Sequence, residues 1–154
     1  MVSTRLAPKF WAAQFKVVWN AWCTASRFQQ DSPCLFCDSA IGTDSLVHIA
    51  HCRTIRETVK RLAAQTEYHP SHFFGCFDKR AQDDYKLLMA VMVYCTYQQH
   101  NFLRNSDALS KEFKLGNPVT SMCRIIKMQV FALKDSKSKT GIIHFLSRGR
   151  AETT

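Results

Sequence analysis

Three cysteines and one histidine stand at a spacing that is typical of metal ligands. Two residues separate Cys34 from Cys37, ten separate Cys37 from His48, and three separate His48 from Cys52. Two cysteines in a tight turn can direct both sulfur atoms at one point, and side chains at i and i+4 of a helix lie side by side. Three thiolates and one imidazole form a closed tetrahedral set that suits Zn²⁺ and leaves no position for water. The sequence therefore predicts one structural zinc ion.

Other cysteine and histidine patterns offer alternatives to this prediction. The four residues could be buried core residues without a metal, because free cysteine is often buried. His51 could replace His48 as a ligand, but it lies off the shared helical face, so we favour His48. A second metal site could involve His69, His72 and Cys76, although the aromatic residues around them favour a packed loop.

The cysteine count, together with the lack of a secretory signal or a membrane-spanning segment, favours an intracellular location. The chain of 154 residues holds seven cysteines, an odd number that does not favour a disulfide framework. Residues 1–9 contain no apolar stretch of the kind found in secretory signals. No run of about 18 apolar residues is present, so no membrane span is expected. We expect an intracellular protein, nuclear or cytoplasmic, with no membrane partner.

The first predicted helix runs from about Pro8 to Phe28. Its apolar residues include a stripe at helical spacing, formed by Trp11, Phe15, Val18 and Trp22. We interpret this stripe as a face of the core, widened by Phe10 and Trp19. The alternative is a docking face for a partner, in which case the isolated chain would expose tryptophan.

The second predicted helix spans residues 46–65 and carries half of the metal set. Asp44 or Ser45 can cap its first turn. Its inward face is expected to hold His48, Cys52, Ile55, Val59 and Leu62. The two ligands would then lie at the N-terminal end of an apolar face, where a metal could fix the preceding loop to the core.

Two further helices complete the expected fold. One spans about residues 83–103 and is apolar nearly all round over 87–97, which indicates a buried helix. Residues 105–116 read as a polar connection. Asn117 and Pro118 then look like an N-cap and a first helical residue. The apolar stripe of this last helix is Val119, Met122, Ile126, Val130 and Leu133.

The predicted fold is thus mostly α, with about four helices and a zinc-stapled knuckle loop between the first two. We divide the chain into a helical zinc-knuckle domain at residues 1–133 and a basic C-terminal tail at 134–154. Residues 142–146 could form a short strand or remain part of the tail, and the sequence does not decide between them.

The net charge of +9 makes a polyanionic partner electrostatically reasonable. Candidate phosphate contacts lie in the second helix and in the tail: Arg53, Arg56, Lys60, Arg61, Lys134, Lys137 and Lys139. Such contacts would give salt-dependent binding with little sequence preference. The alternative interpretation of these residues is an ordinary solvated face and a disordered tail.

Three segments of the chain resemble the zinc-binding region that follows the polymerase in reverse transcriptases of LINE-type (non-LTR) retrotransposons. They are WCTASRF at residues 22–28, CLFC at 34–37 and LVHIAHC at 46–52. The long helix that follows is also similar to that family's. The resemblance implies zinc coordination by the cysteines and histidine, and RNA or DNA binding that places template and target during target-primed reverse transcription.

The chain departs from the family in lacking a polymerase. Its one Asp-Asp pair, Asp83-Asp84, precedes Tyr85 at a predicted helix start and does not form the aromatic-x-Asp-Asp motif. We therefore expect no enzyme and no small-molecule substrate, but a nucleic-acid-binding accessory module, as a fragment or a separate reading frame, whose partners are RNA or DNA and a polymerase domain. The alternatives are a zinc-stabilised protein-interaction domain that docks through Trp11 and Trp22, and a decayed retroelement remnant without present function.

Overall fold

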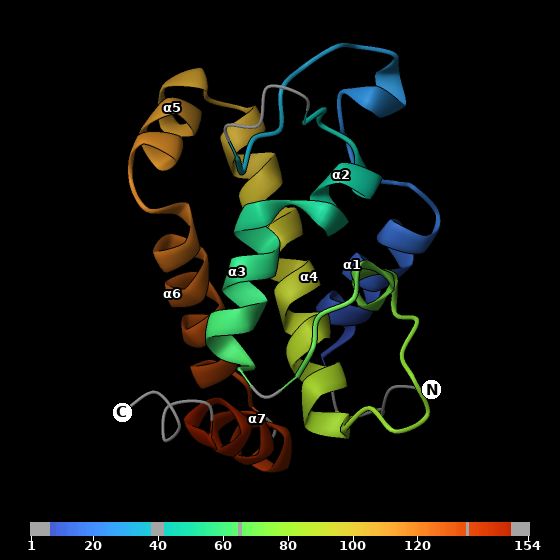
Figure 1. The fold of residues 1–154 in the computed structure, drawn as a ribbon, viewed down its shortest axis with the longest axis vertical. Coiled ribbons are helices and arrows are strands. Elements are labelled where there is room, and N and C mark those ends of the chain that lie inside the picture. Colours follow the sequence, from blue (N-terminus) through green and yellow to red (C-terminus); the bar gives the residue numbers. More distant parts are fainter. Residues whose placement is uncertain (1–6, 38–41, 65, 135, 149–154) are drawn as a thin grey trace.

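The computed structural model describes residues 7–37, 42–64, 66–134 and 136–148, and within these ranges the chain is a bundle of helices (Figure 1). The elements are α1 (Pro8–Val18), η1 (Ser26–Phe28), α2 (Leu46–His51), α3 (Arg53–Leu62), η2 (Pro70–Phe74), α4 (Asp83–Arg104), α5 (Asp107–Leu115), α6 (Pro118–Phe131) and α7 (Ser136–Arg148), where η denotes a 3-10 helix. The described residues form no β-strand, only one isolated bridge between Pro33 and Thr43. The prediction of a mostly helical fold is confirmed, but the described residues form seven α-helices where about four were expected.

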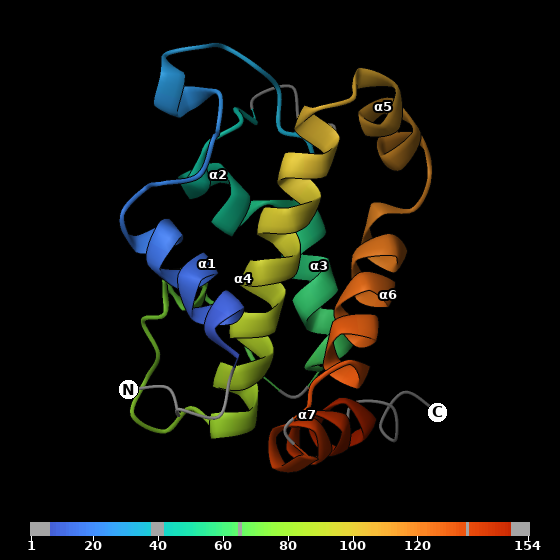
Figure 2. The same ribbon diagram turned by 180° about the vertical axis from the view of Figure 1, so that it is seen from behind.

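Helix α4 is the centre of the bundle. It buries residues on every side between Tyr85 and Thr96, as its nearly continuous apolar sequence predicts. Helices α1, α6 and α7 pack against it, and α3 packs against α6. Figures 1 and 2 show α1 and α6 on opposite sides of α4, with α7 crossing near its first turns.

The first helix is shorter than predicted, and its buried face is different. Helix α1 ends at Val18 because Asn20 takes a left-handed conformation (φ 47°), which asparagine tolerates better than most residues. The face against α4 is formed by Phe10, Ala13 and Val17. The predicted core stripe was wrong at Phe15 and Val18, which are exposed, because apolar residues surround this helix and their spacing does not select one face.

The three tryptophans therefore have different environments. Trp19 is 77% exposed, whereas Trp22 is fully buried against the rings of Phe73, Tyr97 and His100. Trp11 is half-buried. A docking face built on Trp22 is thus excluded, while exposed apolar residues do remain on α1.

The second predicted helix is interrupted at Cys52. The backbone of Cys52 is extended (φ −56°, ψ 132°), so α2 ends at His51 and α3 begins at Arg53. His48 and Cys52 therefore do not share one continuous helix, as the i, i+4 argument assumed. Ser45 caps α2 as predicted, because its side chain accepts a hydrogen bond from the backbone N–H of His48 at 3.1 Å.

Residues 105–116 are not merely a connection, because most of them form α5. Ser106 caps this helix through the backbone N–H of Leu109. Helix α6 begins as the sequence predicts, with Pro118 in its first turn and the Asn117 side chain accepting from the N–H of Thr120 at 2.9 Å. Met122, Ile126 and Val130 of its predicted stripe are buried.

The segment that follows α6 also forms a helix. Residues 142–146 are neither a strand nor an irregular segment but part of α7, where Ile142 and Phe145 are buried against the bundle. Gly141 allows the close approach of α7 to α4, because a Cβ atom at this position would collide with the carboxylate of Asp84. None of the described helices is both long and apolar enough to cross a membrane.

Candidate metal centre

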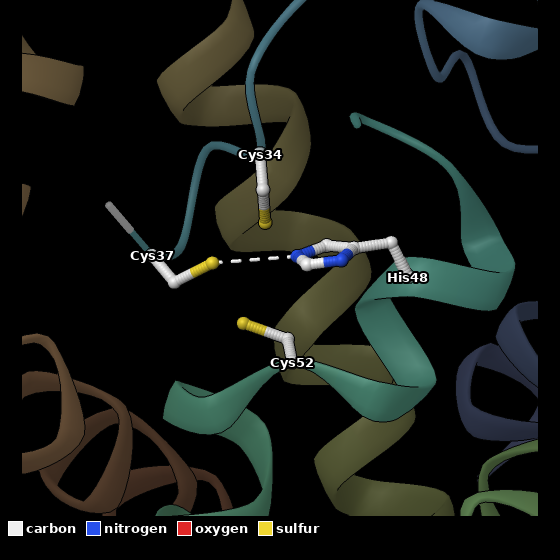
Figure 3. Close-up of side chains that lie close together, drawn as sticks. All are labelled: Cys34, Cys37, His48 and Cys52. Atoms are coloured by element: carbon white, nitrogen blue, oxygen red, sulfur yellow. Dashed lines mark hydrogen bonds between the residues drawn. The ribbon is translucent and has the colours of Figure 1, made fainter. Parts of the chain in front are cut away.

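The four predicted ligands come together in space. The sulfur atoms of Cys34, Cys37 and Cys52 and one ring nitrogen of His48 all lie within 4.8 Å of one another. Figure 3 shows the four side chains pointing toward a common centre. Cys37 Sγ lies 3.3 Å from His48 Nε2. The structure thus forms a cluster that is able to hold one metal ion.

The loop that carries Cys34 and Cys37 is closed by backbone hydrogen bonds. The N–H of Cys34 donates to the carbonyl of Gly42 at 2.7 Å, and the N–H of Asp44 donates to Ser32 at 2.8 Å. These bonds flank the bridge between Pro33 and Thr43. They hold the two ends of the loop together and set it next to α2.

Phe36, between the two cysteines, fixes the loop to the bundle. Its side chain is fully buried and contacts the rings of His100 on α4 and Phe113 on α5. Its carbonyl accepts a 2.6 Å hydrogen bond from the Thr54 hydroxyl in the first turn of α3. We therefore do not expect Phe36 to stack on an unpaired base.

The protonation states of Cys34 and Cys52 depend on each other. A hydrogen bond between the two thiols lowers the pKa of Cys52 to about 5, and the backbone N–H groups of Ile55 and Thr54 at the start of α3 add to this effect against the opposing effect of burial. The same thiol pair, together with burial, raises the pKa of Cys34 far above its usual range. The contacts of Cys52 thus favour its thiolate form, and metal binding would require Cys34 to lose its proton as well.

The donor set fits a tetrahedral zinc ion. Zinc–sulfur bonds of about 2.3 Å in a regular tetrahedron place two sulfur atoms about 3.8 Å apart, which lies within the span of the cluster. Cys34 and Cys52 are buried, whereas Cys37 and His48 are half-buried and face a hollow. Soft thiolates with one imidazole favour zinc over hard cations such as Mg²⁺ or Ca²⁺.

His51 lies outside the cluster. It is exposed, and its Nδ1 is hydrogen-bonded at 2.9 Å to the carbonyl of Val47, one turn earlier in α2. We expect His51→Gln to retain the metal content of the unaltered chain, measured by elemental mass spectrometry. His48→Gln is the matched variant and should lower the metal content strongly. Loss of metal from the His51 variant and retention by the His48 variant would reverse the assignment.

The loop with His69, His72 and Cys76 forms no second metal cluster in the described part of the chain. His72 is buried, and its Nδ1 lies 3.0 Å from the hydroxyl of Tyr85 on α4. Its ring stacks on Phe77. Burial lowers the pKa of His72, which favours the neutral ring. These contacts agree with the packed aromatic loop that the sequence favours.

The cations predicted to contact phosphate occupy different places. All four on α3 are exposed: Arg53, Arg56, Lys60 and Arg61. Lys134 is exposed between α6 and α7, and Lys139 is half-buried on α7. The side chain of Lys137 lies outside the described part of the structure.

Three cations that line hollows on this side of the bundle were not selected from the sequence. Lys114 faces the hollow beside Cys37 and His48, and Arg124 and Lys127 of α6 line a neighbouring hollow. The sequence does contain a pattern that points to Arg124 and Lys127, because both lie off the apolar stripe of α6 and are therefore placed on its outer face. The hollow at the cluster is therefore bordered by basic residues from α3 and the end of α5, and the cations of α6 lie along the neighbouring hollow.

The described part of the chain is thus a helical bundle with one Cys3His cluster that is able to hold a metal ion. Comparison of the chain with protein-family models, curated proteins and solved structures finds no match.

Proposed function

We propose that the chain is a non-catalytic nucleic-acid-binding module whose knuckle is held by one structural zinc ion. It would act beside a reverse transcriptase polymerase, as the similarity to the region C-terminal to LINE-type polymerases implies. The observation that carries this proposal is the Cys3His cluster, whose four side chains can fill all the coordination positions of one zinc ion. Beside the cluster lies a hollow lined by Arg53, Arg61 and Lys114.

The closed ligand set supports a structural role for the metal. A catalytic zinc site keeps one position for water or substrate, whereas four protein ligands leave none. Zinc would contribute free energy of folding by fixing a loop whose own ends meet only through a few backbone hydrogen bonds. The basic residues beside the loop would then contact phosphates, which accounts for affinity without base specificity.

The test is a titration of labelled single-stranded and duplex oligonucleotides followed by fluorescence anisotropy over a salt series. We expect binding to weaken steeply with salt, because each phosphate contact on a single strand contributes about −0.7 to the slope of log K against log salt. Five such contacts would reduce affinity roughly 100-fold between about 50 and 200 mM salt. Absence of binding at low salt would contradict the proposed function.

The second candidate is a protein-interaction domain, and the exposed residues of α1 favour it. Phe15, Val18 and Trp19 are each more than half exposed. Phe15 and Val18 line a hollow of about 460 Å³ together with Phe74 and Phe77. Apolar docking on this surface would change little with salt, whereas phosphate binding weakens. The same salt series therefore separates the two functions.

A further inference from the structure

Two hollows on the α3–α6 side of the bundle meet at one arginine. The first, of about 870 Å³, extends from Cys37 and His48 along α3 to the turn before α6. The second, of about 650 Å³, lies between the end of α3, α6 and α7. Arg61 lines both. Because α3 and α6 pack side by side (Figures 1 and 2), the two hollows lie in succession along this pair of helices, and we call them together the α3–α6 groove.

The charge of the α3–α6 groove is strongly unbalanced. Among the described residues that line it, the cations are Arg53, Arg61, Lys114, Arg124 and Lys127, and the one acid is Glu57. Among the described residues, none of these five cations forms an ion pair. Arg61 is oriented across the groove by a 3.1 Å hydrogen bond to the hydroxyl of Thr120 on α6. Unpaired cations along a groove favour a chain that carries repeated negative charges.

The far half of the groove also exposes apolar side chains. Phe131 is 59% exposed and Met128 is 61% exposed, and both line the groove beside Arg124 and Lys127. Flat apolar surface next to cations is the combination that single-strand binders use, because bases stack on apolar rings while phosphates meet the cations. A duplex keeps its bases stacked inside, and an acidic peptide has carboxylates in place of bases, so neither would use Phe131 in this way.

We propose that the α3–α6 groove binds single-stranded nucleic acid. Arg61, Arg124 and Lys127 contact its phosphates, and bases stack on Phe131 and Met128. The inference rests on the proposed function and adds to it the strand state of the ligand and the surface that receives it. It also divides the four α3 residues that the sequence predicts to contact phosphate. Arg53 and Arg61 line the groove and are expected to take part, whereas Arg56 and Lys60 do not line it.

The first test reverses charge in the groove with Arg124→Glu plus Lys127→Glu. The matched control is Lys79→Glu plus Arg80→Glu, which makes the same charge change at exposed positions on the loop before α4, away from the groove. With a labelled 20-nucleotide oligo(dT) strand, the groove variant should bind at least tenfold more weakly, and loss of two phosphate contacts should reduce its salt slope by about 1.4. The control should stay within about threefold of the unaltered chain. Equal metal content and melting temperature establish that all chains are folded.

The second test addresses stacking and needs no change of charge. Phe131→Ala should weaken binding of the single strand about fivefold or more, because stacking of one base contributes about 1–3 kcal/mol. Phe15→Ala, on α1, removes an equally exposed ring outside the groove and should leave binding unchanged. The unaltered chain should bind the single strand at least tenfold more tightly than a duplex of equal length.

Each other outcome contradicts a defined part of the proposal. If the unaltered chain binds no oligonucleotide, the proposed function and the groove assignment both fail. If it binds but both charge variants weaken equally, nucleic-acid binding stands and the groove assignment fails. Equal affinity for duplex would overturn the single-strand claim. Displacement of the oligonucleotide by polyglutamate of equal charge would identify the groove as a site for acidic peptides.

Discussion

A chain carrying Cys37→Ser is expected to lose its zinc and to melt at a lower temperature. Changes outside the ligands themselves already cost zinc sites about 10–100-fold in affinity, and loss of a thiolate ligand costs more. If free zinc stands 1,000-fold above its dissociation constant, bound metal contributes about 4.1 kcal/mol to the free energy of unfolding. For a domain of this size such a loss corresponds to a fall of roughly 8–16 °C in melting temperature.

The measurement combines elemental mass spectrometry with thermal melts in the presence and absence of a chelator. Chelation of the unaltered chain should reproduce the melting temperature of the Cys37→Ser variant, because both remove the same metal. Cys76→Ser is the matched control, since Cys76 is an exposed cysteine outside the cluster. A Cys37→Ser chain with unchanged melting and full metal content would contradict the structural role of zinc. Oligonucleotide binding should decline together with the metal, because the knuckle borders the basic groove.

The cluster of three cysteines and one histidine could be predicted from the sequence because residue type and chain spacing act locally. Two cysteines separated by two residues can meet at one point in almost any tight turn. The arrangement of the second pair was not predicted correctly, since the chain bends at Cys52. No glycine or proline marks this bend. It arises where Thr54 bonds to the carbonyl of Phe36, a residue 18 positions away, and such long-range contacts leave no local pattern.

Helix starts were predictable wherever a polar side chain caps them, as Ser45 and Asn117 do. The inward face of α1 could not be predicted, because this helix carries apolar residues on all sides. Only packing against α4 selects Phe10, Ala13 and Val17 as the buried residues. Helix α7 was missed for the opposite reason. Helix α7 has few apolar residues, so its sequence resembles a charged tail and does not indicate a helix.

A larger surprise is Asp44, which the sequence suggested only as a possible cap for α2. The structure buries it at the junction of three segments. Its Oδ2 accepts a 2.9 Å hydrogen bond from the N–H of Ala25, and its Oδ1 accepts one of 2.7 Å from His100 Nε2 on α4. Its backbone bonds to Ser26 and Ser32. Asp44 thus links the segment after α1, the loop that carries Cys34 and Cys37, and the central helix.

We expect Asp44→Ala to destabilise the protein by about 3–5 kcal/mol, because removal of one partner leaves buried polar groups uncompensated. The N–H of Ala25 and the buried ring of His100 would lose their acceptor, and Arg104 would lose the ion pair that it forms with Asp44 at 3.7 Å. Asp44→Asn should lose less, since an amide oxygen can still accept one of these hydrogen bonds. Urea unfolding with excess zinc present measures the difference without a contribution from metal loss.

The control for Asp44→Ala is Asp83→Ala, which breaks the ion pair of Asp83 with Lys86 at the exposed start of α4. Exposed pairs contribute about 0–1 kcal/mol, so this variant should stay close to the unaltered chain. If Asp44→Ala were equally mild, the hydrogen bonds to Ala25 and His100 would not hold the knuckle against α4. If it is severe, zinc affinity should fall as well, because Asp44 directly precedes the cap of the helix that carries His48. The metal site and the helical core would then be one cooperative unit, joined through a buried carboxylate rather than through the metal alone.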